Sequence, residues 1–261
     1  MAYEFILVEK EDNIAVVTLN RPPANALNQG LMSELGVLID QVQADNEIRA
    51  LVVTGAGEKF FSAGADLKEM PSLFGGETGP GEMTRRGQAI FTKFERSSTP
   101  VIAAINGMAF GGGCELALAC HFRMAAQSAK IGLVEVNVGI MPGYGGTQRL
   151  PRLIGRAKAI EMATLGLQVP AEAAFGIGLL NEVVPDAELL GKAKEFAKRV
   201  AAQAPVAVAL IIDAIIRGSE TDIDQGQNIE AENFEKVVQS ADAIEGVQAF
   251  IQKRKPNYQG R

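Results

Sequence analysis

The hydrophobic pattern divides the chain into two parts. Up to about residue 185, short apolar runs alternate with segments of helical periodicity, and from about 186 onward the pattern is helical throughout. Strands that alternate with helices are typical of an α/β fold, here a spiral or a layered sheet. The apolar runs are bounded by turn residues and predict β-strands over residues 3–10, 14–19, 51–54, 100–104 and 122–126.

Leucine and isoleucine positions between the strands predict the helices. Apolar residues recur at helical spacing from Leu27 to about Ala44, and a second helix is expected at about 82–97. Residues 206–212 are apolar around the whole helical circumference, so we expect this segment to be buried, and another subunit is one surface that would cover it. The four helices expected in the C-terminal part cover residues 186–203, 206–217, 222–238 and 241–253.

Three consecutive glycines, Gly111 to Gly113, lie between a predicted strand and a predicted helix that carries Glu115. Glycine has no Cβ, so the backbone there can approach a ligand closely. The start of the helix offers unpaired N–H groups and the positive end of the helix dipole. Donors for a developing negative charge and an acid/base group are therefore close together, which indicates catalysis. The alternative is a turn that serves tight packing, with Glu115 as a solvated first-turn residue.

Two more glycine-containing turns follow the same design, at 63–67 before a short helix and at 141–146. The segment 71–81 contains four glycines and two prolines, and this composition excludes a regular element. It is either a surface loop or a flap over a site.

Charge and composition narrow the classes of function. The formal net charge is −6 and no cluster of Lys and Arg is present, which argues against nucleic acid and anionic membranes as partners. No apolar run approaches the roughly 18 residues that span a bilayer, and the N-terminus has no signal-like core. We therefore expect a cytoplasmic protein.

The scarce residue types exclude several kinds of site. His121 is the only histidine, so a histidine-based metal site is excluded, and its place directly after an apolar helix favours a structural role. Cys114 and Cys120 are expected to be reduced core thiols. Phe60 occupies the third glycine position of a possible dinucleotide fingerprint that begins at Gly55, which makes a Rossmann site improbable.

The three glycine-rich turns together resemble the crotonase superfamily, and within it the enoyl-CoA hydratases. The resemblance extends over essentially the whole chain, and its most specific segments are residues 61–70, 100–115, 139–150 and 249–255. It implies an α/β spiral of ββα units over 1–200 that holds a CoA-ester site, followed by a helical oligomerisation region over 201–261. It also implies a homotrimer or a dimer of trimers and an acyl-CoA thioester as substrate. No metal and no separate cofactor are expected, because coenzyme A is part of the substrate.

The resemblance also implies roles for particular residues. The backbone amides of Ala65 and Gly112 correspond to the oxyanion hole, Glu115 to the group that acts mainly on water, and Glu135 to the group that acts mainly on the C2 proton. Further substrate contacts implied in this way are Ala63, Gly64, Asp66, Leu67 and Lys68 along the CoA arm, Gly143 near the catalytic water, and Phe250 and Lys253 from the last helix, reaching the CoA of a neighbouring subunit.

The sequence departs from the family pattern at two positions, and three alternative functions remain open. Val134 stands where many hydratases have proline, which affects how Glu135 is aimed, and His121 stands where many have aspartate. The nearest alternative is a hydratase or isomerase of an unusual acyl-CoA, with a cyclic dienoyl, crotonobetainyl or branched acyl group. RNA binding is disfavoured by the acidic charge. A silent scaffold is disfavoured because competent residues fill all four catalytic positions.

Overall fold

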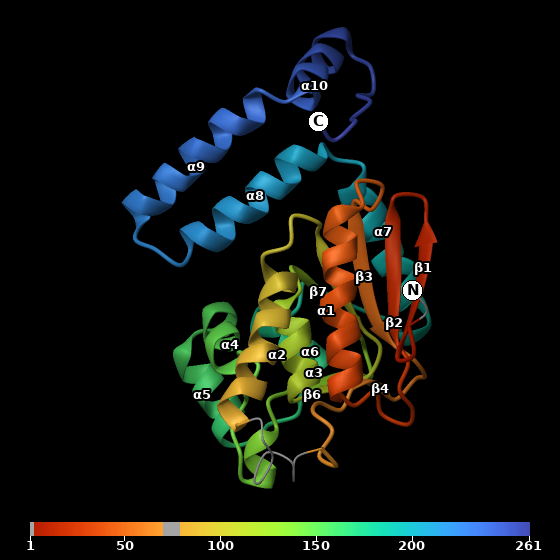
Figure 1. Ribbon diagram of the computed structural model, residues 1–261, viewed down its shortest axis with the longest axis vertical. Helices are drawn as coiled ribbons and strands as arrows, with labels where there is room; N and C mark the ends of the chain where they lie inside the picture. Colours follow the sequence, from red (N-terminus) through yellow and green to blue (C-terminus); the bar gives the residue numbers. More distant parts are fainter. Residues whose placement is uncertain (1–2, 70–78) are drawn as a thin grey trace.

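The computed structural model of the chain describes residues 3–69 and 79–261 and consists of an α/β body with a helical arm (Figure 1). The expectation of an irregular segment at 71–81 falls mostly outside the described residues. Only its last three positions are described, and they form the N-cap and the start of helix α2 (Pro80–Glu95). The predicted short helix after 63–67 likewise lies outside them beyond the turn at 67–69.

The larger sheet has six strands in the order β1-β2-β3-β5-β7-β10. β1 and β2 form an antiparallel hairpin, and the other neighbours pair in parallel. Every residue of β3 and β5 is buried, as expected for central parallel strands that are covered on both faces. The strands are β1 (Ile6–Glu11), β2 (Ile14–Leu19), β3 (Ala50–Gly55), β5 (Val101–Ile105), β7 (Phe122–Ala126) and β10 (Glu182–Val184).

A second sheet of four short strands, which the sequence pattern does not predict, lies beside the first. β4 (Phe60–Ser62), β6 (Met108–Phe110) and β8 (Lys130–Gly132) pair in parallel, and β9 (Val169–Pro170) pairs antiparallel with β8. Each strand of this trio follows directly on a strand of the large sheet. The chain therefore repeats a ββα unit that places one strand in each sheet, and the predicted crotonase-like spiral is confirmed.

Helices cover the sheets and complete the units. α1 (Gln29–Ala44) begins where the Asn28 side chain accepts from the Leu31 amide at 2.8 Å, and it packs beside α2 (Figure 1). α3 (Gly112–Ala119) is buried at every position. The remaining elements of the body are the 3₁₀ turns η2 (Glu135–Val138) and η3 (Asp186–Glu188) and the helices α4 (Gly146–Ile154), α5 (Arg156–Thr164), α6 (Ala171–Gly176) and α7 (Leu189–Ala201).

The C-terminal arm consists of α8 (Pro205–Gly218), α9 (Ile223–Val238) and α10 (Ala241–Gln252), which extends away from the sheets (Figure 1). α8 and α9 pack against each other as a helical hairpin. Residues 206–212 are not buried within one chain, since no residue of α8 is buried and Ile211 is 57% exposed, and their burial against another subunit stays a prediction. The oligomerisation role of residues 201–261 stays a prediction.

None of the described helices is by itself long and apolar enough to cross a membrane. Residues 186–201 and helix α8 reach the necessary length and composition only together, and they meet at an angle of 103°.

Two close backbone approaches hold the second sheet against α3. A Cβ atom on Gly113 would lie 2.4 Å from the carbonyl oxygen of Ser62, and one on Gly64 would lie 2.8 Å from that of Phe110. Only glycine fits at such distances, and Gly64 also has a φ of +97°. These contacts place the turn after β4 directly beside the start of α3.

Gly113→Ala is expected to lower the free energy of unfolding by about 1–3 kcal/mol, because the added methyl group forces β4 and α3 apart. The control is Gly191→Ala in α7, where a Cβ atom would meet nothing within 4 Å. This change is expected to raise the free energy of unfolding by about 0.5–1 kcal/mol, through helix propensity. Urea titration of both variants measures the difference, and equal stability of the two would contradict the close contact.

Candidate active site

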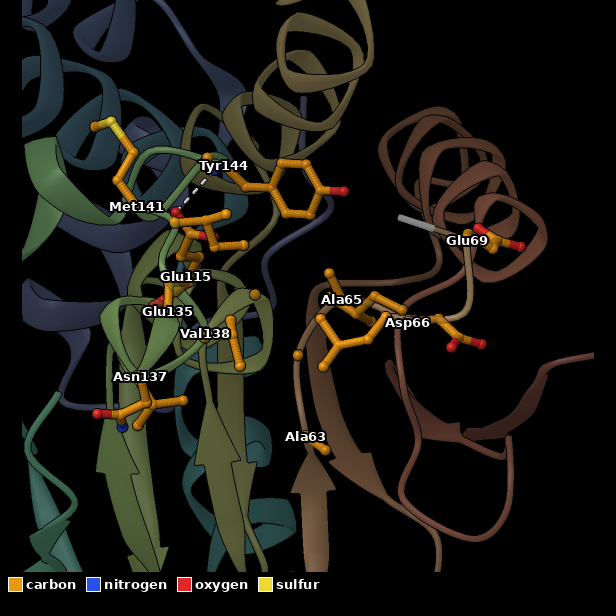
Figure 2. Close-up of a pocket in the computed structure, with 18 of the residues that line it drawn as sticks. Ala63, Ala65, Asp66, Glu69, Glu115, Glu135, Asn137, Val138, Met141 and Tyr144 are labelled. Carbon is orange, nitrogen blue, oxygen red and sulfur yellow. Dashed lines mark hydrogen bonds between the residues drawn. The ribbon is translucent and has the colours of Figure 1, made fainter. Parts of the chain in front are cut away.

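A cavity of about 390 Å³ opens where the turn after β4, the start of α3, η2 and the turn before α4 meet (Figure 2). Its lining is mostly apolar, with carboxylates at a few points. The residues around it are Leu27, Ala63, Gly64, Ala65, Asp66, Leu67, Glu69, Met83, Thr84, Gly111, Gly112, Glu115, Val134, Glu135, Asn137, Val138, Ile140, Met141, Gly143, Tyr144 and Gln168.

Two backbone amides on the cavity wall have no acceptor among the described residues. Ala65 forms a parallel bridge with Leu27, but that bridge uses the Gly64 carbonyl and the Asp66 amide, so the Ala65 amide takes no part in it. Gly112 is the first residue of α3, where amides have no intrahelical partner. A Cβ on Gly112 would lie 3.5 Å from the Ala65 nitrogen, so the two amides belong to adjoining turns. Two neighbouring N–H groups without acceptors can both donate hydrogen bonds to one oxyanion.

Glu115 projects from the first turn of α3 and is 1% exposed. Its Oε1 accepts from the Tyr144 amide at 2.8 Å and from the Gly146 amide at 2.7 Å, so it caps the start of α4 from another helix. Burial raises the pKa of Glu115, while the Gly146 and Tyr144 amides and the charge of Arg149 oppose that rise. The pKa of Glu115 therefore stays above its ordinary value, and the two amides and Arg149 limit the rise that burial causes.

Glu135 is the first residue of η2 and is half-buried. Burial, reinforced by the Glu115 charge, raises the pKa of Glu135 to about 7. Its Oε2 is buried and has no hydrogen-bond partner among the described residues. A carboxyl group with this pKa both gives and takes a proton near neutral pH.

Parallel pairing explains why residues twenty positions apart meet. Phe110 at the end of β6 lies opposite Gly132 at the end of β8, so the segments that follow both strands leave the sheet at the same edge. A Cβ on Gly111 would lie 3.2 Å from Glu135 Oε1. Figure 2 shows Glu115 and Glu135 together on one side of the cavity, with Ala65 on the other. The site thus combines two carboxyl groups of different character with two free amides.

Comparison with known proteins identifies the family of the chain. The sequence model of the enoyl-CoA hydratase/isomerase family matches residues 9–261. The chain belongs to this family.

Individual relatives of this family are similar over nearly their whole length. The crotonyl-CoA hydratase of Syntrophomonas wolfei is 45% identical over 259 residues, 99% of each chain. The short-chain-enoyl-CoA hydratase of Clostridium acetobutylicum is 44% identical and covers 96% of this chain and 95% of its own. The crystal structure of an enoyl-CoA hydratase from Bacillus anthracis superposes with a TM-score of 0.93 at 41% identity and covers 99% of this chain and 100% of its own. These relatives support enoyl-CoA hydratase activity for this chain.

Several of the substrate contacts expected from the family resemblance lie at the cavity, and three do not. Ala63, Gly64, Asp66, Leu67 and Gly143 line it, like the four expected catalytic positions. Lys68 is exposed beside it but does not line it. Phe250, 85% exposed, and Lys253 lie at the end of α10 and do not line the cavity of their own chain. Their contact with the CoA of a neighbouring subunit stays a prediction.

The residues that hold Glu115 in place are not among those expected from the sequence. The amides of Tyr144 and Gly146 belong to a turn that the sequence predicts only to be glycine-rich. The sequence feature that could have indicated them is the glycine pair at the start of a helix, because helix N-termini bind anionic groups. The Tyr144 ring packs edge-on against Phe91 of α2 at 5.6 Å between centroids. Gly87 leaves room for that ring, since a Cβ there would lie 2.3 Å from it.

His121 is structural, as expected. Its Nδ1 accepts from the Val101 amide at 2.9 Å, so its Nε2 carries the proton and donates to the Glu95 carbonyl at 3.0 Å. Burial lowers the pKa of His121 to about 4, which keeps it neutral. Cys114 and Cys120 are buried free thiols, as expected. Within residues 3–69 and 79–261, no group of three or more His, Cys, Asp or Glu side chains is arranged to hold a metal ion.

Glu135→Gln is expected to become more stable relative to the natural protein as the pH rises from 5 to 8. The folded-state pKa of Glu135 is about 7, above the ordinary 4.5, so its contribution to stability is full below pH 4.5 and falls as the pH rises to 7. Glutamine does not titrate. The stability difference should grow by about 1–2 kcal/mol between these pH values, after allowance for partial exposure.

The measurement is urea unfolding of both proteins at pH 5 and pH 8. Glu172→Gln on α6, an exposed position, reports the effect of removing any carboxylate. A difference that is the same at both pH values would show that Glu135 keeps an ordinary pKa.

Proposed function

We propose that the protein is a short-chain 2-enoyl-CoA hydratase that adds water reversibly across the C2=C3 bond of the thioester. The observation that carries this proposal is the convergence of Glu115, Glu135 and the free amides of Ala65 and Gly112 on one cavity. The crotonyl-CoA and short-chain relatives, at 45% and 44% identity, support a short acyl chain.

In the proposed reaction, the thioester oxygen accepts hydrogen bonds from the Ala65 and Gly112 amides. Water attacks C3 and gives its proton to Glu115, while the C2=C3 electron pair moves toward the thioester oxygen and forms an enolate. The two amides stabilise that negative charge. Glu135 then donates its proton to C2, which leaves the hydroxyacyl thioester. Only protons and one water molecule are exchanged, so the chemistry requires no cofactor beyond the CoA of the substrate.

The environments of the two carboxyl groups support this division of roles. The Oε1 atom of Glu115 is bound by two amides, which favours the ionised form that a base on water requires. Glu135, with a pKa of about 7, retains its proton in much of the population at neutral pH. Since the two groups interact, they titrate as a pair. In the reverse direction the roles are exchanged, and Glu135 takes the C2 proton.

Glu115→Gln and Glu135→Gln are each expected to lower kcat for crotonyl-CoA hydration about 10²–10⁴-fold, because each removes one proton transfer. KM should change little, since the amides and the cavity remain. The assay follows the loss of enoyl-thioester absorbance, with Glu172→Gln as control. If both variants retain the natural rate, the two-carboxylate mechanism is wrong.

Gly64→Ala is expected to lower kcat about 10²–10³-fold. A Cβ atom 2.8 Å from the Phe110 carbonyl would displace the Ala65 amide from its position beside the Gly112 amide. The matched control is Gly57→Ala. Gly57 also has a positive φ, +79°, but a Cβ atom there would meet nothing within 4 Å. Both variants carry backbone strain, and only Gly64→Ala should lose turnover. Equal rates in the two variants would contradict the oxyanion role.

The alternative is a hydratase or isomerase of a cyclic, crotonobetainyl or branched acyl-CoA. It is favoured by Val134, which lines the cavity next to Glu135 in place of the family's frequent proline. Crotonyl-CoA that binds without turnover, combined with turnover of a branched or cyclic ester, would select this alternative.

We also infer a homotrimer or a dimer of trimers, formed through residues 201–261. Support comes from the open apolar faces of the arm, where Ile215 is 65% exposed and Phe250 85%. Exposed apolar area of this kind marks an association surface.

A further inference from the structure

Arg149 is a buried arginine that takes no part in the steps above. It lies in the first turn of α4 and is 8% exposed. Helical side chains tilt toward the start of their helix, and this one reaches back to the Tyr144 carbonyl, to which its Nη1 donates at 2.9 Å. The guanidinium therefore contacts the turn that binds Glu115.

The same turn holds Glu115 through its amides. Tyr144 and Gly146 both donate to Glu115 Oε1, at 2.8 and 2.7 Å. Between them Gly145 has a φ of +105°, and a Cβ atom there would lie 2.3 Å from Arg149 Nη1. Arg149 packs directly against the backbone that carries the two donors, so its place determines where those amides point.

Arg149 is fixed in turn by the end of α2. Its Nη2 donates to Glu95 Oε2 at 2.7 Å and lies 3.4 Å from Thr92 Oγ1. The Glu95 carbonyl accepts from His121, whose other ring nitrogen binds the first residue of β5. A planar guanidinium contacts Tyr144 and Glu95 at once, which a single ammonium group matches poorly.

Arg149 also acts through its charge. It lowers the pKa of Glu115, against the burial that raises it. The charged and titratable groups that face Glu115 from the surrounding elements are Arg149 of α4, Glu135 of η2, Tyr144 of the turn and Cys114 of α3.

We propose that Arg149 is a positioning residue that holds the Tyr144–Gly146 turn, and thereby Glu115, in the reactive arrangement, with Glu95 anchoring Arg149 to α2. This inference rests on the proposed hydratase function, in which Glu115 is the base for water. It predicts that changes at Arg149 alter the pH dependence of the reaction as well as its rate.

The test compares Arg149→Met with Arg149→Lys in crotonyl-CoA hydration from pH 5.5 to 8.5. The methionine variant loses the charge, so the acidic limb of kcat should move up by about one pH unit, and its loss of kcat should grow from pH 8 to pH 5.5, by at most about tenfold. The lysine variant retains the charge, so its limb should stay in place while kcat falls by one factor at all pH values. Arg152→Met, an exposed arginine of the same helix, is the matched control and should behave as the natural protein.

Glu95→Gln provides a second variant that leaves Arg149 in place. It removes a negative charge and should move the acidic limb to lower pH, opposite to Arg149→Met. Two results would show that Arg149 has only a packing role. One is a loss of kcat in Arg149→Met that is equal at all pH values, and the other is acidic limbs of Arg149→Met and Glu95→Gln that do not move in opposite directions.

Titration of protein labelled with ¹³C at the glutamate carboxyls separates this inference from the proposed function. The Glu115 resonance is assigned by its loss in Glu115→Gln, and its pKa should rise in folded Arg149→Met. If the natural protein does not hydrate crotonyl-CoA, the function fails while this titration still tests Arg149. A Glu115 pKa equal in both proteins would overturn the inference.

Discussion

The parallel pairing of β4, β6 and β8 is the constraint on which the site depends. Because the three strands run in the same direction, the turns that follow them leave the small sheet at one edge. The glycines at 64 and 113 then allow those turns to come into backbone contact. Without this edge, the two free amides and the two carboxyl groups would have no common cavity.

The two glutamates at the cavity have different surroundings, and these surroundings affect their protonation differently. Glu115 is the more deeply buried, and the amides at the start of α4 offset part of the loss of water. Glu135 has no such donors at its buried Oε2, and its pKa rises to about 7. Hydrogen bonding as well as burial thus makes the environments of the two carboxyl groups different.

The body and the arm differ in how far their apolar side chains are buried. In the body, the central strands β3 and β5 are fully buried, and α7 packs its alanines against the large sheet. In the arm, α8 and α9 pack against each other, and large apolar side chains of α8 to α10 stay exposed. The segment at 206–212 has the composition of a core helix, but no residue of it is buried within one chain.

The sequence by itself determined the elements whose signal is local. Apolar runs gave the long strands of the large sheet, periodicity gave α1 and the C-terminal helices to within a few residues, and the glycine run marked the start of α3 beside Glu115. The resemblance to the crotonase superfamily added Glu135 and Ala65, which no local signal singles out. Tertiary structure alone decided the small sheet, whose strands of two or three residues are too short for a periodic pattern. It also decided the Glu115 contacts with the α4 turn and the placement of Arg149 behind that turn, because pairing and burial bring together residues that are far apart in the sequence.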